Sequence, residues 1–268
     1  MTRATLVRLI AAILVLTALL AVPMTQIHWD GTQASAQADK IDTLLNVMIV
    51  LSCFVFAIVL VMLGYCVWKY RAKPGDESDG EPIHGNTKLE IAWTVIPTVI
   101  VLFGAVYSWI ILDDIEAKAS NAMPLTITAQ QYKWTFEYPQ PKGQDPVVSN
   151  TLVVPVDRQL DANIRALDVL HSFWVEEWGI KRDAIPVGQA GVVGDEVDNT
   201  FVVTPDKLGT FTVQCTELCG YGHSTMRAYV RVVSQDDFDA WLQKQAKSGP
   251  PAPPVPNAPS GATASGSS

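Results

Sequence analysis

Two long apolar segments dominate the hydropathy pattern in the first half of the chain. Neither residues 44–68 nor residues 91–112 contain a charged side chain, and each exceeds the roughly 20 residues that an α-helix needs to cross a bilayer. A pair of buried core helices is the alternative, but uncharged segments of this length have no polar face to turn towards water. The pattern therefore predicts a transmembrane helical hairpin within residues 37–120.

Charged residues next to these segments orient the hairpin. Lys69 and Arg71 follow the first segment and Lys88 precedes the second, whereas Asp113 and Asp114 follow the second. Because basic residues favour the cytoplasmic side, the connecting loop is predicted in the cytoplasm and the rest of the chain outside.

The N-terminal segment, residues 1–36, has the pattern of an export signal. Arg3 and Arg8 precede an apolar stretch at residues 9–22, and residues 34–36 read Ala-Ser-Ala, which resembles a cleavage site. We expect a signal peptide that is removed, with an uncleaved third helix as the alternative. Both place residues 23–42 outside the cytoplasm.

The segment at residues 121–247 alternates short β-branched and aromatic runs with turn residues, which indicates strands. The predicted strands are 125–138, 151–156, 162–168, 200–204, 210–215 and 227–233. We expect a compact all-β sandwich of Greek-key type, with a barrel as the alternative. Ser234 is placed to cap a final helix, whose Phe238, Trp241 and Leu242 share one face. Residues 248–268 are rich in Pro, Ala, Gly and Ser and are predicted to be a disordered tail.

The exported segment is acidic. Residues 124–247 hold 16 acidic and 11 basic side chains, a net charge of −5, which disfavours nucleic acid and suits a cationic partner or simple solubility. Two acidic groups flank the motif described next, and we interpret them as a docking face. They are Glu176 and Glu177 in one loop and Asp195, Glu196 and Asp198 in another.

One short loop gathers soft metal ligands, namely Cys215, Cys219, His223 and Met226. Thiolate and thioether favour copper, and imidazole accepts both copper oxidation states. A structural zinc is the alternative, although zinc loops rarely recruit Met. A disulfide between the two cysteines is also compatible with export, but it leaves the neighbouring His and Met unexplained.

His171 is the candidate for a second imidazole, because His28 lies in the N-terminal segment and His84 in the cytoplasmic loop. With it the set becomes two Cys, two His and one Met, one thiolate more than a mononuclear blue-copper centre uses. Two thiolates can bridge two metal ions. Such a pair offers no open position for a substrate, so the pattern favours electron transfer over catalysis at the metal.

From about residue 40 to 247 the chain resembles subunit II of haem–copper cytochrome c oxidases, chiefly through the spacing of Cys215, Glu217, Cys219, His223 and Met226. The resemblance implies a cupredoxin-like Greek-key sandwich anchored by a two-helix transmembrane hairpin. It also implies a dinuclear copper A site. Its ligands would be Cys215, Cys219, His171, His223, Met226 and the main-chain carbonyl of Glu217. The Glu217 side chain becomes a candidate ligand for a magnesium ion shared with subunit I, with a solvated carboxylate as the alternative.

Two further stretches carry the resemblance. In residues 88–97, Glu90 matches the family's acid at the mouth of a proton channel; the alternative is a helix N-terminus stabilised by its dipole. In residues 131–138, Tyr132 replaces a Trp that the family uses for electron uptake, and Trp134 is the next aromatic candidate. Lys133 adds positive charge there. Asp183 matches a family residue near the subunit I interface.

The resemblance therefore implies the electron-accepting subunit of a respiratory oxidase in the bacterial cell membrane, with the copper domain on the extracytoplasmic face. Electrons would come from a c-type cytochrome and pass to haem in subunit I, where oxygen is reduced to water with proton translocation. Subunit I, subunit III and membrane lipid are the implied partners. A quinol oxidase subunit that keeps the fold without copper and a membrane copper-delivery protein are the alternatives.

Overall fold

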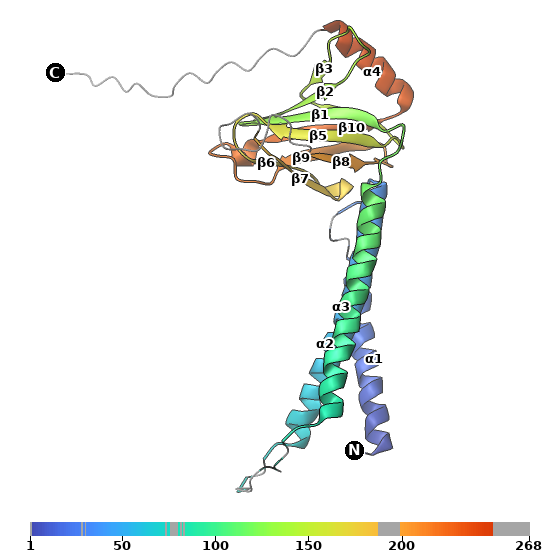
Figure 1. Cartoon of the computed structure of the whole chain (residues 1–268), viewed down its shortest axis with the longest axis vertical. Helices are drawn as coiled ribbons and strands as arrows, with labels where there is room; N and C mark the ends of the chain where they lie inside the picture. The colour runs from blue at the N-terminus through green and yellow to red at the C-terminus, as the bar shows by residue number, and fades with distance from the viewer. Residues whose placement is uncertain are drawn as a thin grey trace, which may run out of the picture.

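The chain forms a helical stalk with a β-domain at one end (Figure 1). The computed structural model describes residues 2–27, 29, 31–72, 74–75, 80, 82, 84–186 and 199–248. Three apolar helices, α1 (Arg3–Thr25), α2 (Ala36–Lys69) and α3 (Thr87–Glu116), are each long enough to cross a membrane. The predicted hairpin corresponds to α2 and α3, and α1 packs along α2. The structure therefore has a third apolar helix beside the predicted hairpin, which is the alternative to a signal peptide, and removal of residues 1–36 stays a prediction.

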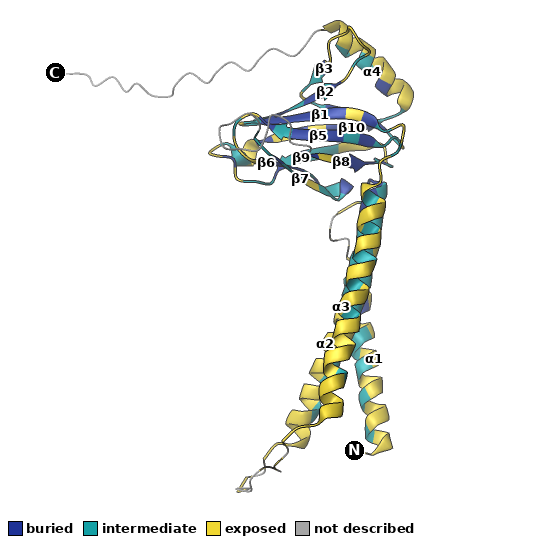
Figure 2. Cartoon of the chain, viewed as in Figure 1, coloured by how far each residue is buried: buried dark blue, intermediate teal, exposed yellow. Residues whose placement is uncertain are grey.

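Most residues of the stalk helices are exposed or half-buried (Figure 2), and many of the exposed ones are large and apolar. None of the residues of α3, all of which the structure describes, is buried. Hydrocarbon tails or apolar partner helices would cover such a surface, whereas water would not. The stalk is thus built for a bilayer.

The β-domain is a two-layer sandwich. One sheet has the order β3 (Val147–Ser149), β2 (Lys133–Tyr138), β1 (Met123–Gln130), β5 (Leu160–Ala166) and β8 (Thr200–Val203). The other has the order β4 (Leu152–Pro155), β10 (Arg227–Val233), β9 (Gly209–Cys215), β6 (His171–Val175) and β7 (Ile180–Ala184). Strict alternation of buried and half-buried residues in β2 and β5 shows that the layers meet face to face. The predicted sandwich is confirmed.

The strand predictions differ from the structure in two respects. The run 125–138 forms two antiparallel strands, because the chain turns at Gln131 and Tyr132. Strands β3, β6 and β7 were not predicted. The centre of β7 is Lys181, Arg182 and Asp183, which has no apolar period; pairing with β6 makes it a strand.

The C-terminal helix α4 (Gln235–Ser248) forms as predicted. The Asp237 amide donates to Ser234 Oγ over 3.2 Å, which is the expected N-cap bond. Phe238 is buried, and the Trp241 ring lies 5.1 Å from that of Tyr138. The apolar face of α4 therefore covers one end of the sandwich.

A short segment ties the stalk to the β-domain. Ser35, fully buried, accepts from the Ala38 amide to cap α2 and donates to the carbonyl of Trp178 over 2.8 Å. Gln37 Oε1 accepts from the Thr204 amide over 2.9 Å. The predicted cleavage after Ala36 would cut within this segment.

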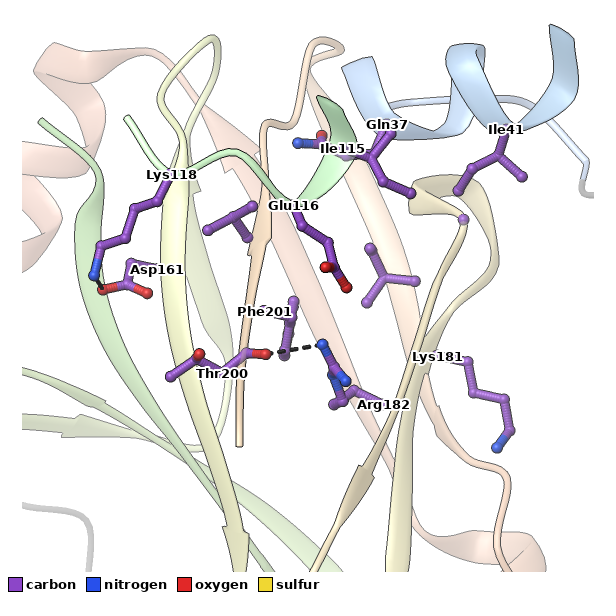
Figure 3. A pocket seen from close by; sticks show the side chains of 13 residues that line it. Gln37, Ile41, Ile115, Glu116, Lys118, Asp161, Lys181, Arg182, Thr200 and Phe201 are labelled. Atoms are coloured by element: carbon purple, nitrogen blue, oxygen red, sulfur yellow. Dashed lines mark hydrogen bonds and ion pairs between the residues drawn. The ribbon is translucent and has the colours of Figure 1, made fainter. Parts of the chain in front are cut away.

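Beside this segment, a cavity of about 350 Å³ lies between the ends of α2 and α3 and strands β5, β7 and β8 (Figure 3). An ion pair between Lys118 and Asp161 closes one side of it. Arg182 donates to the Thr200 carbonyl on the other side.

Tyr138 offers a test of how the two sheets are joined. Its hydroxyl accepts from the Val153 amide over 2.8 Å and donates to the Val153 carbonyl over 3.0 Å, so β2 of one sheet holds β4 of the other. Tyr138→Phe leaves both backbone groups unpaired in the core, and we expect it to lower the free energy of unfolding by about 1–3 kcal/mol. Urea unfolding of the detergent-solubilised chain, followed by near-UV circular dichroism, measures this. Tyr229→Phe, at an exposed position of β10, is the control; equal stability of the two variants would contradict the prediction.

Candidate metal centre

Strand pairing brings two candidate ligands to one end of the second sheet. His171 is the first residue of β6 and Cys215 the last of β9, and the register pairs Phe173 with Cys215. A hydrogen bond of 3.0 Å from the Thr216 amide to the Ser172 carbonyl continues this pairing beyond the strand end. Both side chains face the domain interior, where His171 is 0% exposed.

The loop between β9 and β10 supplies the remaining candidates. The loop closes on itself, since the Cys215 amide donates to the Met226 carbonyl over 3.1 Å. A short 3-10 turn at His223–Thr225, held by a bond of 3.1 Å from the His223 amide to the Gly220 carbonyl, returns the chain to β10. Cys219 and Met226 are buried within this loop and His223 is half-buried.

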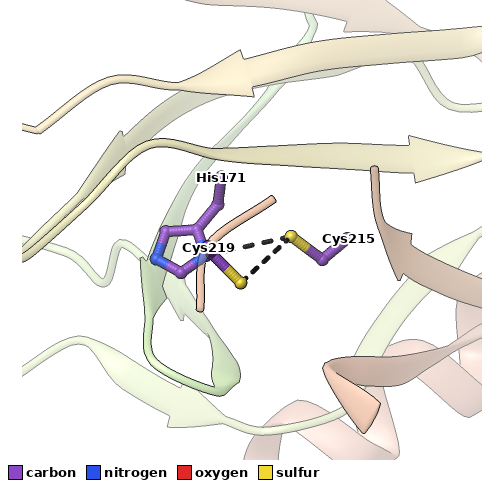
Figure 4. A group of neighbouring side chains, drawn as sticks. All are labelled: His171, Cys215 and Cys219. Carbon is purple, nitrogen blue, oxygen red and sulfur yellow. Dashed lines mark hydrogen bonds between the residues drawn. The ribbon is translucent and has the colours of Figure 1, made fainter. Parts of the chain in front are cut away.

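Three side chains, those of His171, His223 and Met226, converge on the sulfur atoms of two cysteines. The Sγ atoms of Cys215 and Cys219 lie 3.8 Å apart. His171 Nδ1 is 3.8 Å from Cys215 Sγ, whereas His223 Nδ1 and Met226 Sδ lie 3.6 Å and 3.9 Å from Cys219 Sγ. Figure 4 shows the innermost part of the cluster, in which the ligand atoms of His171, Cys215 and Cys219 all fall within 4.8 Å of one another.

This donor set fits soft metal ions. Both cysteines are free thiols, and 3.8 Å between the sulfurs is far beyond the S–S bond of about 2.05 Å. Metal–thiolate bonds of about 2.3 Å would let both sulfurs bind one ion lying between them. The Glu217 carbonyl oxygen, 3.3 Å from Cys215 Sγ, adds a main-chain donor.

The Cys219 thiol is held protonated at neutral pH in the absence of a metal. Burial, and secondly the charge of Cys215, raises the pKa of Cys219 to about 11. Because thiolate is the binding form, metal uptake must release protons, and soft cations would compete best for this site.

Hydrogen bonds around the cluster orient its ligands. Asp168 Oδ1 lies 2.9 Å from His171 Nε2. Partial burial raises the pKa of Asp168, but hydrogen bonds from the amides of Gln131 and Val169 and from His171 hold it below its ordinary value. Sequence reasoning missed Asp168 and Gln131 as parts of this site; the available signal was an acid three residues before a candidate ligand His.

The two aromatic candidates occupy different places. Trp134 is buried, with its ring centroid 6.3 Å from that of His171 in an edge-to-face arrangement. Tyr132 is half-buried and lies over the loop from Cys215 to Met226, the metal-binding loop. A Cβ atom placed on Gly222 would come within 2.5 Å of Cδ2 of Tyr132, so only a glycine admits the ring this close to the loop backbone.

Other predicted residues lie away from the sulfur cluster. Glu90 is exposed in the first turn of α3, where its carboxylate accepts from the Asn86 amide over 3.2 Å. Glu176 and Glu177 stand at the opposite end of β6, five residues of about 3.3 Å each from His171. The Glu177 carbonyl binds the Ala34 amide there, so this half of the predicted docking face lies against the stalk, away from the metal ligands.

Asp195, Glu196 and Asp198 lie outside the described residues. Asp183 is half-buried in β7 beside Ser172 of β6, one residue from His171.

Comparison with known protein families agrees with this geometry. The model described as cytochrome C oxidase subunit II, transmembrane domain, matches residues 21–111. The model described as cytochrome C oxidase subunit II, periplasmic domain, matches residues 144–233.

Individual relatives match over most of this chain. Cytochrome c oxidase subunit 2 of Thermostichus vulcanus is 30% identical over 279 residues, covering 84% of this chain and 80% of the relative. Quinol oxidase subunit 2 of Bacillus subtilis is also 30% identical, over 82% of this chain and 66% of its own length. Among solved structures, the periplasmic domain of subunit II of cytochrome oxidase from Bradyrhizobium japonicum is 29% identical, covers 50% of this chain and 98% of its own, and has a TM-score of 0.40.

Proposed function

The chain belongs to the cytochrome c oxidase subunit II family, and from this premise we propose that its β-domain holds a copper A pair that receives electrons from a c-type cytochrome. The observation that carries the proposal is the convergence of two thiols, two imidazoles and a thioether around sulfurs 3.8 Å apart. Soft donors in this number suit two copper ions better than one.

The protein's own contribution is to hold the metal ligands rigidly and to shield them from water. His171, Cys219 and Met226 are almost fully buried, and each is fixed by a strand end or by a hydrogen-bonded turn. When bound, copper supplies one-electron redox chemistry. Because the ligands are rigid and shielded from water, the metal site would change its geometry little between the two oxidation states. A small change favours fast electron transfer onward to haem in subunit I. In subunit I, oxygen is reduced to water with proton translocation.

The stalk supports a location in the bacterial cell membrane, multi-pass, with the copper domain outside the cytoplasm. Subunit I and subunit III would contact the exposed apolar faces of the stalk helices together with lipid. This arrangement sets the copper domain at the outer surface, where a soluble cytochrome can reach it.

The outer surface beside the cluster is suited to receive the electron donor. Leu218 is 78% exposed and Tyr221 fully exposed, both in the metal-binding loop beside Tyr132. Apolar and aromatic side chains in contact with a site are the usual core of a transient docking patch. We place electron uptake at Tyr132, because Trp134 lies in the core against His171.

Two acidic residues carry further proposals. Glu217, half-buried in the loop, is the candidate ligand for a magnesium ion shared with subunit I. Glu90 is the candidate for proton uptake, since it is exposed at the predicted cytoplasmic end of α3.

The quinol oxidase relative makes a copper-free subunit the second candidate. The complete donor set argues against it, because a chain that binds no metal has no need of two adjacent buried thiols beside two imidazoles. A copper-delivery protein is the third candidate. Delivery needs accessible, exchangeable thiols, whereas Cys219 is 3% exposed.

Cys219→Ser tests the metal assignment. The change removes one of the two sulfurs, so we expect copper content to fall from two ions per chain and oxidation of cytochrome c by the assembled oxidase to stop. Metal analysis with electron paramagnetic resonance measures the first effect, since a pair sharing one unpaired electron gives a distinct signal. Cys66→Ser, at an exposed position in α2, is the matched control. Normal electron transfer in Cys219→Ser would sink the assignment.

Tyr132→Ala tests electron uptake. Loss of the ring leaves the copper ligands in place but removes the aromatic surface between them and the donor, so we expect cytochrome c oxidation to slow at least tenfold with an unchanged copper signal. Stopped-flow mixing with reduced cytochrome c measures the rate. Tyr132→Trp should retain most of the activity, and an undiminished rate in Tyr132→Ala would place uptake elsewhere.

Glu90→Gln separates proton uptake from helix capping. Gln keeps an oxygen that accepts from the Asn86 amide but carries no titratable proton. If Glu90 collects protons, steady-state turnover of the assembled oxidase should fall while copper reduction by cytochrome c stays normal. Unchanged turnover would leave Glu90 with its capping role alone.

A further inference from the structure

Asp168 is a polar side chain beside the metal ligands that has several hydrogen-bond partners. Its Oδ2 accepts from the Gln131 amide over 2.7 Å, and its Oδ1 accepts from the Val169 amide over 2.7 Å and lies 2.9 Å from His171 Nε2. Two backbone donors thus fix the carboxylate before it meets the imidazole. The Asp168 carboxylate therefore links the loop between β5 and β6 to the candidate ligand His171.

This contact decides which nitrogen of His171 faces the cluster. A carboxylate accepts hydrogen bonds, so His171 Nε2 carries the proton and Nδ1 keeps its lone pair. Nδ1 is the nitrogen that lies 3.8 Å from Cys215 Sγ. Carboxylate-bonded imidazoles of this kind are oriented and made more basic as metal ligands.

Gln131 connects the Asp168 carboxylate to the second cysteine, Cys219. Its amide donates to Asp168, and its side-chain Nε2 donates to the carbonyl of Cys219. Asp168 therefore touches His171 directly and reaches Cys219 through one residue. The second imidazole differs: within the described part of the chain, no carboxylate contacts His223, which is half-buried.

We propose that Asp168 is a positioning residue that fixes the His171 tautomer and, by placing a negative charge against this imidazole alone, sets the affinity and midpoint potential of the bound copper. The part of this proposal that concerns copper, its copper half, rests on the proposed function. A fixed negative charge near the metal stabilises the oxidised, more positive state, so Asp168 lowers the potential. The His171 side of the cluster is the more electron-rich side.

The tautomer is tested without copper. In the full-length chain purified in detergent and labelled with ¹⁵N-histidine, we expect the His171 signals of a ring protonated at Nε2 and not at Nδ1. Asp168→Asn should lose this fixed pattern. A His171 ring protonated at Nδ1 in the wild type overturns the proposal, whatever metal the protein binds.

The copper half is tested by redox titration and competitive copper binding without any cytochrome present, so that an effect of Asp168 on donor docking does not enter. We expect Asp168→Asn to raise the midpoint potential and to weaken copper binding roughly 10–100-fold. Asp168→Glu, which retains the charge, should lie closer to the wild type than Asp168→Asn. Asp145→Asn, at an exposed position shortly before β3, controls for the loss of a surface carboxylate.

The outcomes separate the two proposals. Equal potentials and affinities in the wild type and Asp168→Asn, or equal shifts in Asp168→Asn and Asp168→Glu, overturn the charge effect. A wild type without paired copper overturns the proposed function, while the ¹⁵N spectrum still decides the tautomer. If Asp168→Asn does not fold, the wild-type spectrum and Asp168→Glu carry the test.

Discussion

The pairing of β9 with both β6 and β10 is the constraint on which the metal centre depends. It places the first residue of β6 and the last residue of β9 at the same end of one sheet. The loop from Cys215 to Met226 starts and finishes at neighbouring positions there, so its soft donors have to fold back over the strand end. A shift of one residue in this register would turn Cys215 or His171 to the opposite face.

The same end of the domain is layered from inside to outside. Trp134 packs edge to face against both Phe173 and His171, and His171 in turn lies beside the Cys215 sulfur. Tyr132 and the exposed loop side chains form the outermost layer. Core packing thus supports the ligands from below, and the glycines of the loop let an aromatic ring approach them from above. This order suits electron transfer, because an electron-donating partner would contact the aromatic side chains while the metal ligands stay shielded from water.

The opposite end of the domain joins the helical stalk. The buried Ser35 joins α2 to Trp178, and ion-paired and hydrogen-bonded side chains line the cavity between stalk and sheets. The metal-ligand end and the stalk end are separated by the length of β6. Acidic Glu176 and Glu177 belong to the stalk end, away from the metal ligands.

Features that local chemistry controls could be predicted from the amino-acid pattern. Uncharged apolar runs require α2 and α3, Ser234 caps α4, and the spacing of Cys215, Cys219, His223 and Met226 identifies a soft-metal loop. Tertiary structure alone decided the features that depend on distant residues. The polar strand β7 exists because β6 pairs with it, and Asp168 and Gln131 join the metal site because two separate turns meet over the loop. The hydrophobic period and the types of metal-ligating side chain depend on neighbouring residues in the sequence. The strand register and the hydrogen-bond partners depend on residues far apart in the sequence, so they are fixed only when the two sheets assemble.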